Sequence, residues 1–407
     1  MQNRATLKRA FSLPLLTFYG LGTILGAGIY VLIGEVAGNA GMYTPLAFFL
    51  AAILAAFSAF SYAELSARFP LSAGEAVYTQ RAFGRSELSI VVGLMIVCIG
   101  VVSAATLING FVGYLDVFVH LPAWQVMVLL ILVLSALAMW GISESAWVAA
   151  ITTLIELGGL LLILAVALPQ VDSAASSSTA MMGQSGTLSL MGCFAGAFVA
   201  FYAFIGFEDI VNVAEEVRQP ERTLPRAILI ALAVATALYM LTAWVSISLL
   251  PPQELAASAA PLSLVYLQAT GKEPVFISLI GLSAVINGAL IQIVMASRVL
   301  YGMAAQGWIP AGLSRVNPHT RTPLRSTLLV TGMILVLALW LPLITLAEIT
   351  SLITLIVFSL VNLSLWRIKI RDPKPVGIMT FPLWLPICGF LFSSSFAAFQ
   401  LWRWVAL

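Results

Sequence analysis

Hydrophobic residues fill most of the chain in runs long enough to cross a lipid bilayer as helices. A transmembrane helix needs about 20 consecutive, mostly apolar residues. On this criterion the sequence predicts about eleven spans. They lie at residues 11–34, 43–67, 87–119, 124–142, 146–168, 188–214, 224–250, 275–304, 324–342, 344–366 and 381–405. The run at 87–119 is long enough to imply a tilted helix or one that extends beyond the bilayer.

The first predicted span is interrupted in its middle by Gly26, Ala27 and Gly28. Each glycine disfavours a helix by about 1 kcal/mol relative to alanine. Backbone groups freed from a helix in lipid need partners, so a broken helix survives only where protein or a water-filled cavity supplies them. The interruption therefore predicts a site at mid-membrane depth. A helix-packing interface is the alternative, because glycine and alanine also let helices approach closely.

A second interruption occurs in the span at 188–214, where Gly206 is followed by Phe207, Glu208 and Asp209. Five spans precede this one, so it enters the bilayer from the side opposite to the first span. Interrupted spans at equivalent positions of two oppositely oriented halves are typical of an inverted-repeat transporter. We therefore expect a first five-helix repeat at 1–168, a polar outer loop at 169–187, a second, inverted repeat at 188–366, and a loop with an additional eleventh helix at 367–407.

Composition supports an all-α polytopic membrane protein embedded in a lipid bilayer. The 407 residues are 61% hydrophobic and 9% charged, whereas soluble globular proteins have roughly 25% charged residues. The net charge of +2 gives no reason to expect a nucleic-acid partner. Cys98, Cys193 and Cys388 all lie in apolar runs, so we expect no disulfide framework and no disulfide-linked partner chain.

The distribution of basic residues predicts the orientation. Of the 19 Lys and Arg residues, all except Lys272 and Arg403 fall in segments that are cytoplasmic if the N-terminus is inside. The positive-inside rule then predicts a multi-pass protein of the cell (inner) membrane with a cytoplasmic N-terminus, and with the C-terminus outside if eleven spans is correct. The N-terminal stretch resembles a signal peptide but has no small-residue cleavage site, so we interpret it as a retained first span.

Four motifs carry a family resemblance. They are GLGTILGAGIYVLIGEVAG from residue 20, RFPLSAGEAVYTQRAFGR from 68, AFYAFIGFEDIVNVAEEVRQPERTLPRAI from 200 and ASRVLYGMAAQGWIP from 296. In this order they resemble the amino acid–polyamine–organocation (APC) superfamily, especially its bacterial cationic-amino-acid-transporter-like branch. The resemblance covers nearly the whole chain. It implies a LeuT-type 5+5 inverted repeat with broken helices 1 and 6, and secondary active transport of amino acids by alternating access, as symport or exchange. Many members have a twelfth helix, which the predicted spans lack.

The interrupted first span also predicts how a substrate would bind. The amides of Gly26, Ala27 and Gly28 lie at the positive end of the following half-helix, which suits an anion. The resemblance implies that this anion is a substrate carboxylate and that the carbonyl of Ile24 holds the α-ammonium group. It implies the same carbonyl role in the sixth span for Tyr202, Ala203 and Ile205. Further candidates for the lining that selects the side chain are Tyr202, Phe207, Ser103, Thr106 and Asn109.

Two acidic positions in the spans carry the predicted coupling chemistry. A charge at mid-membrane costs roughly 2.5–3.5 kcal/mol, so each carboxyl group must face a cavity, be protonated or be paired. Glu208 matches an acid that the resemblance links to proton-sensitive transport. The alternative is a hydrogen-bonded acid that fixes the unwound segment. We interpret Asp209 as a structural residue or helix cap.

Glu156 is the single charged residue of its span, at a position where many proton-coupled relatives have a lysine. The reversed sign leaves open whether it binds Na⁺, carries a proton or holds a cationic group. A protonated glutamate bonded to a backbone carbonyl is the structural alternative. We expect Glu156 to form a coupling site with Gly22, Thr23 and Ser283, using H⁺ or Na⁺, with no other cofactor and no further metal site.

Other classes of function fit less well. The stretch Gly183–Gly186 resembles the serine motif of rhomboid proteases, but it lies in the predicted outer loop. The two histidines, His120 and His319, lie at span ends or in loops, so no span supplies a base for the serine and we expect no enzyme. The predicted midplane site also disfavours a channel. An amine or polyamine transporter of the same superfamily, which would not need the Gly26–Gly28 amides, and a transport-fold nutrient sensor remain as alternatives.

Overall fold

The computed structural model describes residues 11–26, 28–71, 74–116, 118–140, 145–182, 190–317, 320 and 322–406. Over these ranges the chain is built from α-helices and short 3₁₀ helices (η). In chain order they are α1 (Leu13–Leu25), α2 (Gly28–Ala40), η1 (Gly41–Tyr43), α3 (Thr44–Arg68), α4 (Gly74–Phe83), α5 (Ser86–Asp116), α6 (Ala123–Trp140), α7 (Ser145–Met182), α8 (Leu190–Tyr202), η2 (Phe207–Glu216), α9 (Pro220–Leu249), α10 (Pro252–Ala257), α11 (Pro261–Thr270), α12 (Val275–Ala305), η3 (Ala311–Ser314), α13 (Leu324–Trp340), α14 (Leu343–Arg371) and α15 (Trp384–Ala406).

Helices occupy all of the predicted spans, which confirms an all-α polytopic membrane protein. Among the described residues, 8 helical runs are long and apolar enough to cross a membrane. One of them, Leu13–Arg68, contains the first two predicted spans, and the apolar helices Ala123–Met139 and Leu324–Trp340 are shorter. If Leu13–Arg68 is counted as two spans and the two shorter helices are added, the helices correspond to the eleven predicted spans. The division into two inverted repeats stays a prediction.

Helix α7 differs from the prediction. We expected a span that ends at 168 and a polar loop at 169–187, but α7 continues through Pro169 to Met182. A proline inside a helix removes one backbone hydrogen bond and destabilises the helix by about 3 kcal/mol. The chain nevertheless stays helical on both sides of Pro169. The alanines that follow favour helix, so polarity alone was a poor signal of a loop here. Residues 183–189, including the Gly183–Gly186 motif, lie outside the described residues.

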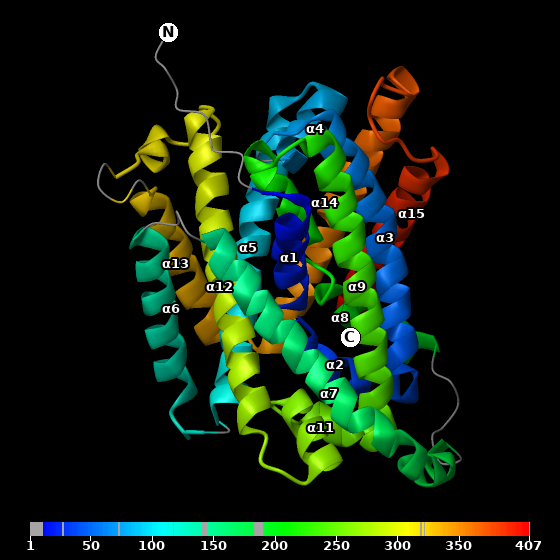
Figure 1. Cartoon of the computed structure of the whole chain (residues 1–407). Coiled ribbons are helices and arrows are strands. Elements are labelled where there is room, and N and C mark those ends of the chain that lie inside the picture. The colour runs from blue at the N-terminus through cyan, green and yellow to red at the C-terminus, as the bar shows by residue number, and fades with distance from the viewer. Residues whose placement is uncertain are drawn as a thin grey trace.

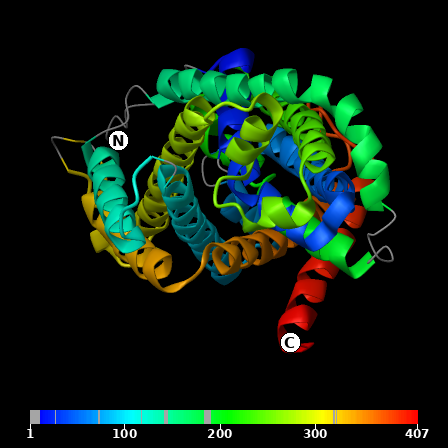
Figure 2. The ribbon, with the colours of Figure 1, turned by 90° about the horizontal axis from the view of Figure 1, so that it is seen from below.

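The broken first span lies at the centre of the bundle. Helices α1 and α2 are surrounded by the other spans (Figures 1 and 2). Helix α1 packs against α7 and α9, and α2 packs against α8. Helix α15 lies at the periphery, where it contacts α14 and α3. The short helices α4 and α11 lie at opposite ends of the bundle (Figure 1), which we call the α4 end and the α11 end.

Small residues bring α5 and α12 together beside the broken helices. A Cβ atom on Gly100 would lie 3.0 Å from the Cβ atom of Ala296, and one on Gly93 would lie 2.8 Å from the sulfur of Met303. Small residues allow helix backbones to approach closely in a bilayer. This contact brings the middle of α5 and the middle of α12 to the same side of the two broken helices, where they form a wall of the site described next.

Candidate functional site

The first break lies between Leu25, where α1 ends, and Gly28, where α2 begins. Gly26 leaves the helical conformation with φ 10° and ψ −127°, and its N–H still donates to the carbonyl of Gly22 over 3.1 Å. Ala27 lies outside the described residues. Gly28 packs directly on the second break, because a Cβ atom there would lie 2.6 Å from Cα of Ala203.

The second break follows Tyr202, where α8 ends, and η2 begins at Phe207. Gly206 has φ 129°, a conformation that side chains rarely adopt. A Cβ atom on Gly206 would lie 2.5 Å from the carbonyl oxygen of Thr23. The Thr23 hydroxyl donates to the Gly206 carbonyl over 2.8 Å. Both predicted interruptions are therefore confirmed, and the two are hydrogen-bonded to each other.

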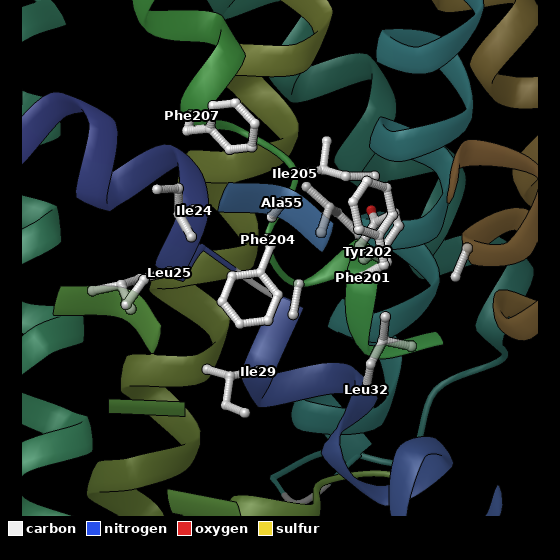
Figure 3. Close-up of a cluster of buried hydrophobic side chains, with 14 of the residues drawn as sticks. Ile24, Leu25, Ile29, Leu32, Ala55, Phe201, Tyr202, Phe204, Ile205 and Phe207 are labelled. Carbon is white, nitrogen blue, oxygen red and sulfur yellow. The ribbon is translucent and has the colours of Figure 1, made fainter. Parts of the chain in front are cut away.

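Tyr239 of α9 joins the two breaks a second time. Its hydroxyl oxygen lies 2.7 Å from the carbonyl of Ile24 and 3.0 Å from the carbonyl of Ala203, and the side chain is fully buried. A phenol has one proton, so the two carbonyls share a single donor. The ring packs edge-on against Phe204, which Figure 3 shows among the buried side chains around the breaks. The carbonyls predicted to bind a substrate ammonium group therefore contact a tyrosine hydroxyl in this structure.

A cavity lies beside the two breaks. The empty space there is about 390 Å³, a volume that includes the part open to solvent. The predicted residues that line it are Thr23, Ile24, Gly26, Gly28, Ser103, Tyr202 and Ile205. The lining residues that we did not predict are Leu107, Gly288, Ile291 and Gln292.

The remaining candidates for the lining have other contacts. The Phe207 ring lies 5.7 Å from the ring of Tyr62 and 5.3 Å from that of Phe358. The Thr106 hydroxyl donates to the carbonyl of Val102 on its own helix. Asn109 donates to the carbonyl of Ala338 at the end of α13. None of these three candidates is among the residues that line the cavity.

The predicted coupling residue Glu156 is completely buried on α7. Its Oε1 atom lies 3.4 Å from Nδ2 of Asn287, and its Oε2 atom has no hydrogen-bond partner within the described residues. Gly22 faces the same place, because a Cβ atom there would meet Thr153 and would lie 3.8 Å from Nδ2 of Asn287. The contact from α12 thus comes from Asn287, one turn after the predicted Ser283.

Glu208 and Asp209 are both buried and have different partners. The Oε2 atom of Glu208 accepts a hydrogen bond of 2.8 Å from the backbone N–H of Gly206. Glu208 therefore holds the unwound segment, as its structural alternative proposed. The Oδ2 atom of Asp209 accepts a hydrogen bond from Nε2 of Gln292 on α12 over 3.2 Å. Gln292 connects Asp209 to the wall of the cavity.

Among the described residues, His120 and the three cysteines lie apart from one another or on the surface. The described residues contain no group of three or more His, Cys, Asp or Glu side chains arranged to hold a metal ion. Cys98, Cys193 and Cys388 are free thiols. His120 pairs with Asp116 over 2.7 Å on the exposed surface, and this hydrogen bond raises the pKa of His120.

Comparison with known proteins decides the family. Residues 11–404 match the amino acid permease family. The chain belongs to this family. The permease is 29% identical to the branched-chain amino acid permease BcaP of Bacillus subtilis over 90% of its own length and 82% of that protein. The resemblance to the APC superfamily is thereby confirmed, and the permease is a multi-pass membrane transport protein, not an enzyme.

Eukaryotic relatives are similar but longer. The permease is 31% identical to cationic amino acid transporter 4, vacuolar, of Arabidopsis thaliana, over 88% of its chain and 63% of that protein. It is 30% identical to human cationic amino acid transporter 4, over 91% of its chain and 61% of that protein. The permease therefore spans less than two thirds of the length of these two relatives.

Sequence reasoning missed Tyr239, Asn287 and Gln292. The two amides are polar residues in the middle of a predicted span, which is a usable signal, because polar groups in lipid need partners. Tyr239 gave no such signal, since a tyrosine in an apolar span is compatible with simple packing. Its contact with two carbonyls depends on how α9 packs against both breaks.

Proposed function

We propose that this permease is a secondary active transporter that moves amino acids through the cavity between the two breaks by alternating access. The observation that carries the proposal is the direct bonding of two unwound segments beside one small cavity. Unwound backbone at this depth supplies free amides and carbonyls for the charged groups of a substrate. Movement of the helices that carry the breaks would then expose the cavity to each side in turn.

The two charged groups of an amino acid fit opposite sides of the breaks. Gly28 is the first residue of α2, where backbone amides and the helix dipole favour a carboxylate. The carbonyls of Ile24 and Ala203 favour an ammonium group, which would displace the Tyr239 hydroxyl that contacts both of them. A substrate that carries both charges uses both sets of backbone groups.

The wall of the cavity favours a neutral, apolar side chain. Ile24, Leu107, Ile205 and Ile291 contribute apolar surface, whereas the polar lining comes from uncharged groups such as Ser103. We therefore infer that neutral amino acids with apolar side chains bind better than acidic ones. Cationic amino acids are the second candidate, because the buried acids Glu156 and Glu208 make the surrounding protein negative when they are ionised.

A binding screen tests the substrate class. Purified permease would be heated with leucine, isoleucine, valine, arginine or lysine, and with the amines that their decarboxylation gives. We expect the branched-chain amino acids to raise the melting temperature most and the matching amines to have little effect. Stabilisation by amines alone would contradict the carboxylate site and favour an amine or polyamine transporter. Flux of the stabilising compound in proteoliposomes then separates a transporter from a nutrient sensor, which would bind without moving it.

We infer further that Glu156 belongs to the coupling site and uses H⁺ or Na⁺. The support is its burial beside Asn287 and Gly22, together with the oxygen that has no partner among the described residues. The substitution Glu156→Gln removes the charge and keeps the shape. We expect it to abolish the dependence of uptake on pH or on sodium. Unchanged uptake with unchanged pH and sodium dependence would exclude Glu156 from coupling.

A further inference from the structure

A further buried acidic group, on α4, has no role in the site described above. Glu75 lies on α4, outside the membrane-spanning helices, yet it is only 2% exposed. Tyr62 of α3 and Tyr78 of α4 lie close enough for the Glu75 carboxylate to act on both phenols.

The start of α4 packs on η2, because a Cβ atom on Gly74 would lie 2.7 Å from Cγ2 of Val211. At this contact the Glu75 carboxylate acts electrostatically on Glu208 and Asp209. We call Glu75, Glu208 and Asp209 the acidic cluster.

The acidic cluster extends from the cavity to α4. Gln292 lines the cavity and donates to Asp209 over 3.2 Å. Glu208, which precedes Asp209 in the chain, accepts a hydrogen bond from the backbone N–H of Gly206 at the second break. Glu75 completes the series at the α4 end, which the distribution of Lys and Arg predicts to be cytoplasmic. These residues therefore lie between the cavity wall, at Gln292, and α4, at Glu75.

Several buried polar atoms of this region have no protein partner. Within the described residues, Oε2 of Glu75, the hydroxyl of Tyr78 and Oε1 of Gln292 make no hydrogen bond. Tyr78 is fully buried, and its hydroxyl lies near the start of α4, because a Cβ atom on Gly74 would be 2.8 Å from it. Buried polar groups are nearly always hydrogen-bonded. These atoms are therefore buried polar groups to which the described residues supply no hydrogen-bond partner.

The basic side chains of α4 and α14 named here do not neutralise the acidic cluster. Arg81 lies over the ring of Phe69, and Arg367 lies over the ring of Phe83. Lys369 pairs with Glu64 at 2.7 Å. The Glu75 carboxylate acts instead on the phenols of Tyr62 and Tyr78 and on the two acids of η2. Burial raises the pKa of Glu75 to about 7, so its proton can be gained and lost near neutral pH.

We propose that Glu75 is a proton-binding residue through which the acidic cluster exchanges protons with solvent at the α4 end during transport. The proposal rests on the proposed function and adds a residue to it. While Glu75 is buried, its neutral form is favoured. When the α4 end opens, its O–H proton passes to water and leaves a carboxylate. Closing buries Glu75 again and requires the carboxylate to take a proton back, so closure is linked to proton uptake.

An infrared titration tests whether Glu75 binds this proton. Glu75→Gln imitates the protonated side chain, and Glu87→Gln, at an exposed glutamate at the start of α5, is the matched control. The full chain in lipid nanodiscs would be titrated across neutral pH while the band of protonated carboxyl groups is recorded. We expect the wild type and the control to lose part of this band near pH 7 and Glu75→Gln to lose a smaller part, by the share of one carboxyl group. The same titration in all three proteins would overturn the proposal.

Flux measurements test whether transport uses the proton. Proteoliposomes would be assayed with labelled leucine and labelled arginine, in counterflow and in uptake driven by a pH gradient. We expect Glu75→Gln to lose at least about tenfold in pH-driven uptake and to keep counterflow within about twofold. Equal loss in both assays, or no loss in either, would contradict the proposal. Failure of the wild type to exchange either amino acid would instead contradict the proposed function, and the infrared titration would still decide whether Glu75 binds the proton.

Discussion

Gly206 lies where the second break packs closely on the first. Its φ of 129° is unfavourable for any side chain, and an added Cβ would lie 2.5 Å from the Thr23 carbonyl. Strain of this kind costs of order 1–3 kcal/mol. We expect Gly206→Ala to reduce amino acid counterflow to less than about a tenth of wild type.

The matched control for this substitution is Gly158→Ala. Gly158 lies within α7, and a Cβ atom there would have nothing within 4 Å. It should transport like the wild type at equal protein levels. If Gly206→Ala also kept full counterflow, the close contact between the breaks would not be needed for transport.

A substitution at Tyr239 tests where the ammonium group of the substrate binds. In Tyr239→Phe the carbonyls of Ile24 and Ala203 lose their shared donor, and a buried unpaired group costs about 1–3 kcal/mol. We expect the unliganded protein to melt at a lower temperature and the stabilisation by substrate to become larger, because the ammonium group then supplies the missing donors. Tyr266→Phe on α11 is the control. A smaller stabilisation by substrate in Tyr239→Phe would place the ammonium group elsewhere.

The pKa of Glu75 predicts a dependence of stability on pH. Burial raises this pKa from 4.5 to about 7. Between these values the folded protein holds a proton that the unfolded chain has released, so the contribution to stability falls as the pH rises through this window. We expect Glu75→Gln to remove part of the fall in melting temperature between pH 4.5 and 7. A fall as steep as in the wild type or in Glu87→Gln would show that other groups cause it.

At the scale of elements, a buried ion-pair network fixes the segment before α15 to α3 and α14. Glu64 of α3 accepts from Lys369 over 2.7 Å, from Arg68 over 2.7 Å and from the backbone N–H of Phe381 over 2.8 Å. Lys369 also donates to the Phe381 carbonyl over 2.6 Å. The network therefore determines where the eleventh span enters the bundle.

Removal of one member of this network should lower the free energy of unfolding. Breaking a buried pair destabilises by about 3–5 kcal/mol, and we expect the lower end for Lys369→Met because Arg68 still pairs with Glu64. Thermal unfolding of the purified protein measures the effect. Lys374→Met, at an exposed position of the same loop, should leave the melting temperature unchanged. Equal melting temperatures for both variants would mean that the network adds little to stability.

The predicted elements agree with the structure where the signal is local. The breaks at Gly26 and Gly206 follow from helix propensity and backbone geometry. The extension of α7 through Pro169 was not predictable from polarity, because the end of a helix also depends on helix propensity and backbone hydrogen bonding. The shift of the α12 contact from Ser283 to Asn287 depends on the rotation of α12 against α7, which residue spacing alone does not determine.

At the scale of the whole molecule, the orientation remains a prediction from the basic residues. A reporter that is active only outside the cytoplasm, fused after the last residue, should be active if the eleventh span crosses the membrane. The same reporter fused after Lys374, before α15, should be inactive, and a fluorescent protein should give the opposite pattern. Equal activity at both positions would mean that α15 does not cross the bilayer.

The sequence by itself determined the membrane class, the spans, the two interruptions and the family, because hydropathy, glycine and short motifs act locally or along one element. Only the tertiary structure decided which groups meet. Tyr239 bridges the carbonyls of Ile24 and Ala203, and Glu75 approaches the acids of η2, across separations in sequence that no pattern along the chain encodes. In a bilayer these contacts depend on close packing between helices and on the need of each buried polar group for a partner.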